Sequence, residues 1–235
     1  MDKNSNTYTY IFALIMVTVV AALLSGASIA LKDRQEMNVE QEKQQSILKS
    51  IGVNLDRAQS AEQFSNYITE QLVIQNGSAI ESETSAFDIK MDEAIDLSVE
   101  ERQVPLYVAT KNDTTFYVIP LRGKGLWGPI WGYISLLDDG NTVYGTTFDH
   151  KSETPGLGAE IVGDQFQNQF FGKEIMNNGE FVSVSVVKTG ASNEHEVDGI
   201  SGGTITSVGV DKMLDDCLRP YVGYFNNRAT ALNAE

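Results

Sequence analysis

Residues 198–207 read Asp-Gly-Ile-Ser-Gly-Gly-Thr-Ile-Thr-Ser, a glycine-rich turn that leads into the amphipathic stretch 210–222. The apolar spacing of that stretch predicts a helix whose opening turn carries the hydroxyl of Thr204. The start of a helix offers backbone N–H groups without partners and the positive end of the helix dipole. Such a turn suits a phosphate group, but Gly-Gly-Thr also occurs in ordinary loops and helix caps. These local residues leave a phosphate site and a plain helix cap equally open.

The composition is that of a folded and strongly acidic protein. The 235 residues are 42% hydrophobic and 21% charged, with a formal net charge of −15. This length supports one or two domains with a buried core. The acidic excess argues against a nucleic-acid partner, because nucleic-acid phosphates would be repelled. The same repulsion disfavours loose capture of an anionic ligand from solution, whereas a covalent tether would remove that difficulty.

Metal and disulfide chemistry find little support in the sequence. Cys217 is the only cysteine, so no disulfide can form within the chain and no cysteine cluster can bind zinc or iron–sulfur. The only histidines are His150 and His195, which lack ligand spacing and are expected to be surface or hydrogen-bonding side chains. The carboxylates at 138–139 and at Asp149 have no companion nucleophile motif. We expect them to be turn and surface residues rather than an independent active site.

A membrane anchor is predicted near the N-terminus. Residues 8–31 contain no charge, and at ~1.5 Å per residue such a helix spans about 36 Å, enough to cross a ~30 Å hydrocarbon core. A cleaved signal peptide with a cleavage site near residues 25–30 is the alternative. The apolar run is longer than a usual signal peptide needs, so we expect a permanent single-pass anchor in membrane lipid. By the count of Lys and Arg alone, Lys32 and Arg34 would weakly keep the following domain in the cytoplasm.

The segments after the anchor show helical periodicity. A sparse apolar stripe over residues 32–52 predicts a helical stalk that ends at Gly52. A second helix is expected to begin near Ser60, with Phe64, Tyr67, Ile68 and Leu72 on one face, before Asn76-Gly77 breaks the chain. The predicted organisation is a tail (1–7), a transmembrane helix (8–31), a stalk (32–52) and a globular domain (53–235).

The remaining sequence predicts an α+β domain with a largely antiparallel sheet and packed helices. Strand-like stretches occupy residues 104–108, 115–119, 129–136 and 142–146, and Asp-Asp-Gly-Asn at 138–141 predicts a hairpin turn. Clean alternation over 181–187 predicts a further strand with one buried face. Two helices complete the domain, one over 159–171 and one from about 205 to 222. The first is expected to point Ile161, Phe166, Phe170 and Phe171 inward.

A second loop-to-helix junction, Glu-Thr-Pro-Gly-Leu-Gly-Ala-Glu, lies at 153–160. Two such junctions in one chain favour a binding site over a plain helix cap. Together with the turn at 198–207 and the stretch Lys-Gly-Leu-Trp-Gly-Pro-Ile-Trp-Gly at 124–132, the second junction resembles the FMN-binding domain of the C subunit of the Na+-translocating NADH:quinone reductase. The turn itself resembles the flavinylation motif Asp-x-x-Ser/Thr-Gly-Ala-Thr, with Gly203 in place of the usual alanine. A G-type subunit of an Rnf ferredoxin:NAD+ oxidoreductase complex is the close alternative. The stalk sequence favours the quinone reductase.

The resemblance implies a cofactor and the residues that hold it. FMN would be joined to the Thr204 hydroxyl through a phosphoester bond. Ser201, Gly202 and Gly203 would shape the turn, and Asp198 would be recognised by a separate flavin transferase that moves FMN from FAD. The residues implied to lie against the flavin ring are Glu153, Thr154, Gly156, Leu157, Gly158 and, from looser similarity, Lys188. Trp127 and Trp131 could stack on the ring or face partner subunits, with core packing as the alternative.

The resemblance also implies a place and a role. The flavin domain would lie on the periplasmic side of a bacterial inner membrane, against the weak charge count, and would relay electrons between cofactors of neighbouring membrane and peripheral subunits. The one Gly-x-Gly-x-x-Gly, at 123–128, leads into the strand-like stretch 129–136 and opens no helix, so it is not a dinucleotide-binding fingerprint and we expect no NADH oxidation by this chain alone. Its single anchor carries no charge, so Na+ movement must depend on the whole complex. A membrane-anchored binding or scaffold protein without a cofactor is the alternative from another class.

Overall fold

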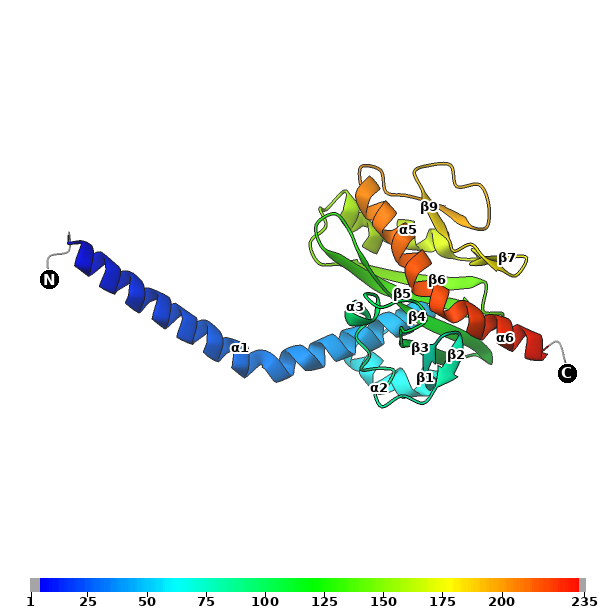
Figure 1. The fold of residues 1–235 in the computed structure, drawn as a ribbon, viewed down its shortest axis with the longest axis horizontal. Coiled ribbons are helices and arrows are strands. Elements are labelled where there is room, and N and C mark those ends of the chain that lie inside the picture. The colour runs from blue at the N-terminus through cyan, green and yellow to red at the C-terminus, as the bar shows by residue number, and fades with distance from the viewer. Residues whose placement is uncertain (1–4, 233–235) are drawn as a thin grey trace. The chain divides into compact units, whose positions relative to one another are not determined.

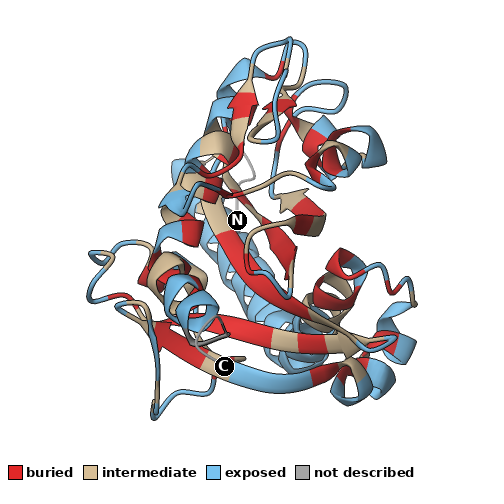
Figure 2. Cartoon of the chain, turned by 90° about the vertical axis from the view of Figure 1, so that its right-hand side faces the viewer, coloured by how far each residue is buried: buried red, intermediate tan, exposed pale blue. Residues whose placement is uncertain are grey.

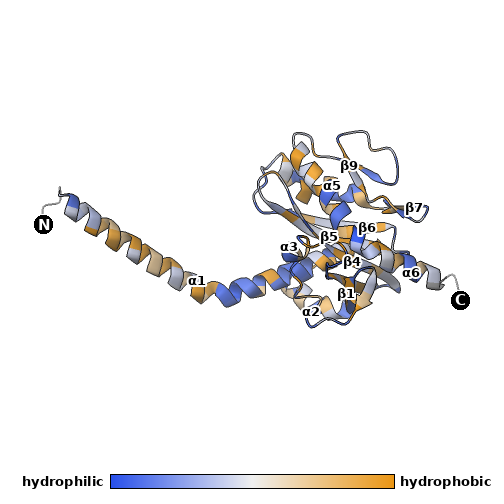
Figure 3. Ribbon diagram, viewed as in Figure 1, coloured by the Kyte–Doolittle hydropathy of each residue, from blue (hydrophilic) through white to orange (hydrophobic). Residues whose placement is uncertain are grey.

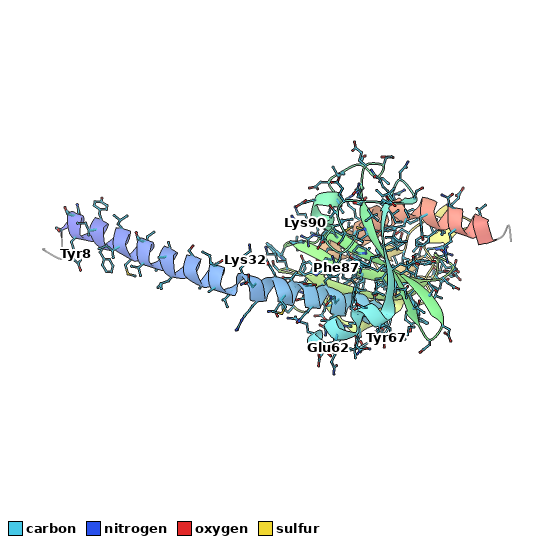
Figure 4. The ribbon with its side chains drawn as sticks, turned by 90° about the horizontal axis from the view of Figure 1, so that it is seen from below. Tyr8, Lys32, Glu62, Tyr67, Phe87 and Lys90 are labelled. Carbon is cyan, nitrogen blue, oxygen red and sulfur yellow. The ribbon has the colours of Figure 1, made fainter. Side chains whose placement is uncertain are left out.

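The structure, a computed structural model, describes residues 5–232 and begins with one long helix, α1 (Asn6–Ser50). Residues 1–43 and 44–235 form two separate units, so the last turns of α1 belong to the second unit. Within the described residues, α1 is the one helix long and apolar enough to cross a membrane, with a mean hydropathy of 2.4 over its best window. Figure 3 shows this apolar segment giving way to a hydrophilic one along α1. Side chains between Tyr8 and Lys32 project outward along the helix (Figure 4), as those of a lipid-facing segment would.

A glycine ends α1. The N–H of Gly52 bonds to the carbonyl of Lys49 at 2.9 Å, and the N–H of Val53 bonds to that of Leu48 at 3.0 Å. This pair of bonds is a Schellman motif, which needs a residue with positive φ, and Gly52 has φ +71°. The predicted span and stalk are therefore one continuous helix whose end is fixed by the glycine that the sequence indicated.

A six-stranded antiparallel sheet forms the body of the second unit, in the order β2-β1-β3-β4-β5-β6. Hairpin turns with positive φ at both central residues join β1 to β2 (Asn76, Gly77) and β3 to β4 (Asn112, Asp113), as type I′ turns require. The predicted hairpin at 138–141 is confirmed between β5 and β6. The strands are β1 (Ile68–Gln75), β2 (Ser78–Ile80), β3 (Val104–Lys111), β4 (Thr114–Lys124), β5 (Pro129–Leu137) and β6 (Val143–His150).

Both faces of this sheet are covered, which Figure 2 shows as continuous burial along its central strands. Along β4, Phe116 and Val118 join one apolar cluster while Tyr117 and Ile119 join the other, because successive side chains point to opposite faces. The end of α1 and α2 (Arg57–Tyr67) cover the first face. Helix α5 (Thr204–Leu218) packs on the other face against β4 and is followed by η3 (Arg219–Tyr221) and α6 (Val222–Leu232), as Figure 1 shows.

Short elements complete the domain, the first between β2 and β3 and the others between β6 and α5. They are α3 (Met91–Ala94), η1 (Gly158–Val162), α4 (Asp164–Gln167), η2 (Asn168–Phe170), β7 (Met176–Asn177), β8 (Glu180–Phe181), β9 (Ser185–Val187) and β10 (Glu196–Asp198). β9 and β10 pair in parallel, and β7 and β8 pair antiparallel. The α+β class with a largely antiparallel sheet is confirmed.

Two predicted helices differ from those observed. Ile68 and Leu72 lie in β1 rather than on the second helix, because α2 ends at Tyr67 and the chain continues as a strand paired with β3. The helix predicted over 159–171 is three short helical segments, since Gly163 takes an extended conformation (φ −73°, ψ 143°) between the first two. Phe166 and Phe170 are buried as expected, but Phe171 is 67% exposed, and its ring packs edge-on against Tyr144.

The last part of the chain also differs in detail. The strand predicted over 181–187 is split into β8 and β9, because Ser183 adopts φ +61° and interrupts the extended backbone. The closing helix is longer than predicted. It begins at Thr204, passes through the tighter turn η3 at Pro220 and continues in α6 to Leu232.

Candidate flavin site

The glycine-rich turn lies at the first residue of α5, as predicted. Thr204 is the first helical residue and Gly203 its N-cap, with no side chain capping the helix. Gly202 takes φ +76°, which lets the chain reverse before the helix starts. The first backbone bond into this turn is from the N–H of Ser207 to the carbonyl of Gly203, at 2.9 Å. No acceptor within residues 5–232 is recorded for the N–H groups at 204, 205 and 206, so they are free for a ligand.

Thr204 and Thr206 differ sharply in environment. The side chain of Thr204 is exposed, and the described part of the chain gives its hydroxyl no hydrogen-bond partner. Thr206 is 1% exposed, and its hydroxyl donates to Glu153 Oε2 at 2.6 Å. Ser207, one residue further, accepts from the N–H of Ile200 at 2.9 Å and so ties the turn back to the helix. Thr204 is therefore the one hydroxyl of this pair of threonines that a phosphate could reach.

The loop at 153–158 meets this turn directly. A Cβ added at Gly158 would collide with Thr206 Oγ1, and one added at Gly202 would lie 2.6 Å from Leu157 Cδ2. These close approaches place the two loop-to-helix junctions against each other, as the resemblance implied. The two junctions form one site although about fifty residues separate them in sequence.

Glu153 joins a third segment to the site. Its carboxylate is 5% exposed, and Oε1 accepts the backbone N–H of Trp127 at 2.8 Å. A Cβ at Gly125 would lie 2.5 Å from the same oxygen. The β4–β5 loop is thus held against the start of α5 through one buried carboxylate. Sequence reasoning placed Glu153 beside a flavin ring and did not identify its bond to Thr206.

The other residues of loop 153–158 are mostly open to solvent. The carbonyl of Thr154 accepts the N–H groups of Leu157 and Ala159, both at 3.1 Å, and so closes the loop. Gly156 has φ +75° and open space around its Cα, while Gly158 is buried. Leu157 is 42% exposed and lies over Gly202.

Asp198 and Lys188 lie at the edge of the site. Val187 pairs with Asp198 in the parallel β9–β10 ladder, and the N–H of Gly199 bonds to the carbonyl of Val187 at 2.7 Å. Lys188 is exposed and follows directly, so it lies beside the start of the turn. The carboxylate of Asp198 accepts the N–H of Ala191 at 2.9 Å, which gives it a role in ordering the 190–198 loop.

Exposed apolar side chains lie on the three segments that form the site. Trp127 is 64% exposed, Ile205 58% and Val208 59%, and Leu126 and Leu157 are also exposed. Core packing is therefore wrong as an account of Trp127. Trp131 is half-buried, with the Arg122 guanidinium 5.6 Å from its ring. Large apolar groups left in water beside a helix start with free N–H groups are typical of a ligand-binding site.

Metal ligands do not converge at this site. Across residues 5–232, no cluster of three His, Cys, Asp or Glu side chains could hold a metal ion. His150 accepts the N–H of Glu153 at Nδ1 (3.2 Å) and so supports the loop. His195 Nδ1 lies 2.7 Å from the carbonyl of Glu174. Asp139 bonds to the N–H groups of Asn141 and Thr142, as expected of a turn residue.

Comparison with known proteins agrees with this geometry. Residues 125–219 match the FMN-binding domain family, and this span holds all three segments of the site. The fold and the site thus define an FMN-binding flavoprotein domain.

Individual relatives show which family of FMN-binding proteins the chain belongs to. The C subunit of the Na(+)-translocating NADH-quinone reductase from Vibrio alginolyticus is 32% identical over 215 residues, which is 84% of each chain. The same subunit from Vibrio anguillarum is 29% identical over 233 residues. A crystal structure of the subunit from Parabacteroides distasonis is 43% identical, with a TM-score of 0.76 over 83% of this chain and 96% of that one. The chain belongs to the C-subunit family of the Na(+)-translocating NADH-quinone reductase.

Proposed function

We propose that this chain is an electron-transfer subunit that carries FMN through a phosphoester bond to Thr204. The observation that carries the proposal is the contrast between Thr204, whose hydroxyl is exposed at the first position of α5, and Thr206, whose hydroxyl is buried and bonded. Both the FMN-binding domain match and the family membership favour FMN as the group attached.

The start of α5 fits the phosphate of FMN. The N–H groups at 204–206 have no recorded protein acceptor within residues 5–232, and α5 is 15 residues long, so its dipole adds positive potential there. The turn formed by Ser201, Gly202 and Gly203 leaves room for a bulky group on Thr204, since the first two are exposed. A phosphoester holds the ligand without relying on capture by a chain of net charge −15.

The exposed apolar residues fit the ring of the flavin. We assign Trp127 and Leu157 as packing surfaces for the ring, with Thr154, Gly156 and Lys188 at its edge. Gly158 and Glu153 face inward and shape the loop from behind. When bound, FMN supplies reversible electron acceptance, and the chain supplies its attachment and orientation.

The setting proposed for this domain is a membrane complex. Residues 8–31 would anchor the chain in the bacterial inner membrane, residues 32–52 would form the stalk, and the domain from residue 53 would lie on the periplasmic side. Other subunits of the reductase would hand electrons to the flavin and receive them, because we expect no NADH oxidation by this chain alone. A flavin transferase that recognises Asp198 would attach FMN during maturation.

Expression of the full chain with a bacterial flavin transferase tests the attachment. The natural sequence should show in-gel flavin fluorescence after denaturation and an intact mass increased by one FMN. Thr204→Ala should lose both signals, whereas Thr206→Ala should carry flavin on Thr204 once loading has gone to completion. A natural-sequence sample without added mass would contradict the proposal and favour the cofactor-free binding protein. Accessibility of a C-terminal tag to periplasmic protease tests the side of the membrane.

A further inference from the structure

Glu153 is a buried side chain that hydrogen bonds from two other segments hold in place. Its two carboxylate oxygens accept from different segments, Oε1 from the Trp127 N–H at 2.8 Å and Oε2 from the Thr206 hydroxyl at 2.6 Å. Gly125 and Gly158 enclose it, because a Cβ at either would lie 2.5 Å from a carboxylate oxygen. None of the ion pairs recorded among residues 5–232 includes Glu153. Hydrogen bonds alone compensate its burial, so each of them is costly to remove.

The bond to Thr206 has a geometric consequence for Thr204. Each residue advances an α-helix by about 100°, so two side chains that are two residues apart differ by about 200° around the axis and face nearly opposite directions. Holding the Thr206 side chain inward at Glu153 therefore turns the Thr204 side chain outward, where it is exposed. The Thr206 hydroxyl is itself only 1% exposed, so a phosphate does not reach it from solvent.

We propose that Glu153 is a positioning residue that fixes the first turn of α5 through Thr206 and thereby presents Thr204 for flavin attachment. The inference rests on the proposed attachment at Thr204 and goes beyond it, since it assigns the groups that select this hydroxyl. In the attachment step, Thr204 Oγ1 forms a bond to the phosphorus of the FMN half of a flavin dinucleotide. The phosphoanhydride bond breaks, AMP leaves with its electron pair, and the hydroxyl proton passes to solvent, with no change of oxidation state.

The test compares initial rates of flavin loading for the purified full-length apo-chain, using a bacterial flavin transferase and FAD. Thr206→Val keeps the volume of the side chain but removes the hydroxyl, and Thr206→Ser restores the hydroxyl. We expect Thr206→Val and Glu153→Ala to load at least tenfold more slowly. Thr206→Ser and Glu153→Gln, which retain hydrogen bonds at the same place, should recover most of the natural rate. Rescue by these conservative variants is a result that a general packing defect would not give.

Matched controls and peptide mapping separate the outcomes. Thr230→Val removes a helix hydroxyl that bonds within its own helix, and Glu180→Ala removes an exposed carboxylate. Both should load at the natural rate. Natural rates in Thr206→Val and Glu153→Ala, with FMN mapped to Thr204, would overturn the positioning role alone. FMN mapped to another residue in the natural chain would instead overturn the attachment at Thr204. Where Glu153→Ala does not fold, the Thr206 pair decides, because both variants keep the carboxylate.

Discussion

The ammonium group of Lys111 lies 2.6 Å from the carbonyl oxygen of Ile51, directly after the last turn of α1. The same group lies 3.4 Å from the hydroxyl of Tyr144 and over its ring. A cation placed on unpaired carbonyls at a helix C-terminus is favourable both as a hydrogen-bond donor and against the helix dipole. Lys111 therefore ties the end of α1 to the sheet.

Replacing this lysine should weaken the domain. We expect Lys111→Met to lower the free energy of unfolding by about 1–2 kcal/mol, because a charged hydrogen bond to the helix end is lost. Urea unfolding of the full-length chain in detergent, followed by tryptophan fluorescence, measures the change. Lys90→Met is the control, since Lys90 makes an exposed pair with Glu93 and should change stability by less than about 0.5 kcal/mol. Equal effects from the two variants would contradict the role of Lys111.

Gly52 is expected to be intolerant of a side chain. With φ +71°, Gly52→Ala should cost about 1–2 kcal/mol of backbone strain, and the added Cβ would also lie 3.1 Å from Lys111 Nζ. Gly179→Ala separates the two causes, because Gly179 has φ +84° but open space around it. A larger fall in melting temperature for the first variant than for the second would measure the crowding at the end of α1.

Gly125 tests the enclosure of the Glu153 carboxylate. Gly125→Ala would put a Cβ 2.5 Å from Oε1, whereas Gly128→Ala would put one at an ordinary 3.4 Å from Ser152 Oγ. We expect the first variant to lose about 1–3 kcal/mol of stability through overpacking, and to load flavin more slowly. The second should behave as the natural chain in denaturant unfolding. Indistinguishable unfolding curves for the two variants would show that the carboxylate can move aside without cost.

Arg102 is a buried cation held by carbonyl groups. It is 6% exposed, and its guanidinium donates to the carbonyls of Asp216, Ile95 and Leu97 at 2.9–3.0 Å. Arg102→Met should lower the free energy of unfolding by about 2–3 kcal/mol, because three carbonyls lose hydrogen bonds from a buried charged donor. Arg219→Met is the comparison, since Arg219 pairs with Asp215 at the surface and should contribute about 0–1 kcal/mol. A denaturation midpoint for Arg102→Met equal to that of the comparison would refute the structural role.

The domain should lose stability at alkaline pH. Burial raises the pKa of the Cys217 thiol to about 11, and it raises the pKa of Tyr107 and Tyr221 well above the ordinary value. The unfolded chain releases these protons first, so the folded state binds more protons in this range. The free energy of unfolding should therefore fall as pH rises above about 9, by up to about 1.4 kcal/mol per pH unit for each group. Chemical unfolding between pH 7 and 10.5 measures the slope, and a flat profile would show that these groups are not buried in solution.

The same burial predicts an unreactive cysteine. Cys217 is fully buried, and its thiolate is disfavoured, so iodoacetamide at pH 8 should label the thiol only when the chain unfolds. Mass spectrometry before and after addition of denaturant gives the labelled fraction. Rapid labelling of the folded chain would contradict the packing of α5 against β4.

Local signals in the sequence predicted the parts of the fold that local chemistry decides. The glycines at 52 and 140 mark a helix end and a hairpin, and both take positive φ. Alternation alone did not reveal that Ser183 breaks the strand at 181–187, because the break depends on its bond to Ile175. Ile68 and Leu72 fit a helical stripe equally well, and pairing with β3 decides for a strand. Tertiary contacts override local periodicity in these places.

The segments of the candidate site could be predicted from the sequence, but the contacts between them could not. The two glycine-rich junctions are visible in the sequence, and the structure brings them together. The hydrogen bond between Glu153 and Thr206 links residues that are 53 positions apart, and neither local stretch of sequence predicts it. The exposure of Trp127 was equally hidden, since an aromatic residue between glycines fits both a core and a surface. Long-range pairing of polar groups is the kind of information that a single sequence lacks.

The last turns of α1 have a practical consequence for any soluble version of this protein. Ile47, Leu48 and Ile51 are 0% exposed and pack with Phe64, Tyr107 and Phe116 on one face of the sheet. A fragment that begins after residue 52 would lack these three side chains and would expose the apolar face of the sheet that they cover, so it should aggregate. Truncation between residues 32 and 43 removes the apolar segment 8–31 and keeps this packing intact. A protease site or an expression start is therefore best placed within these residues.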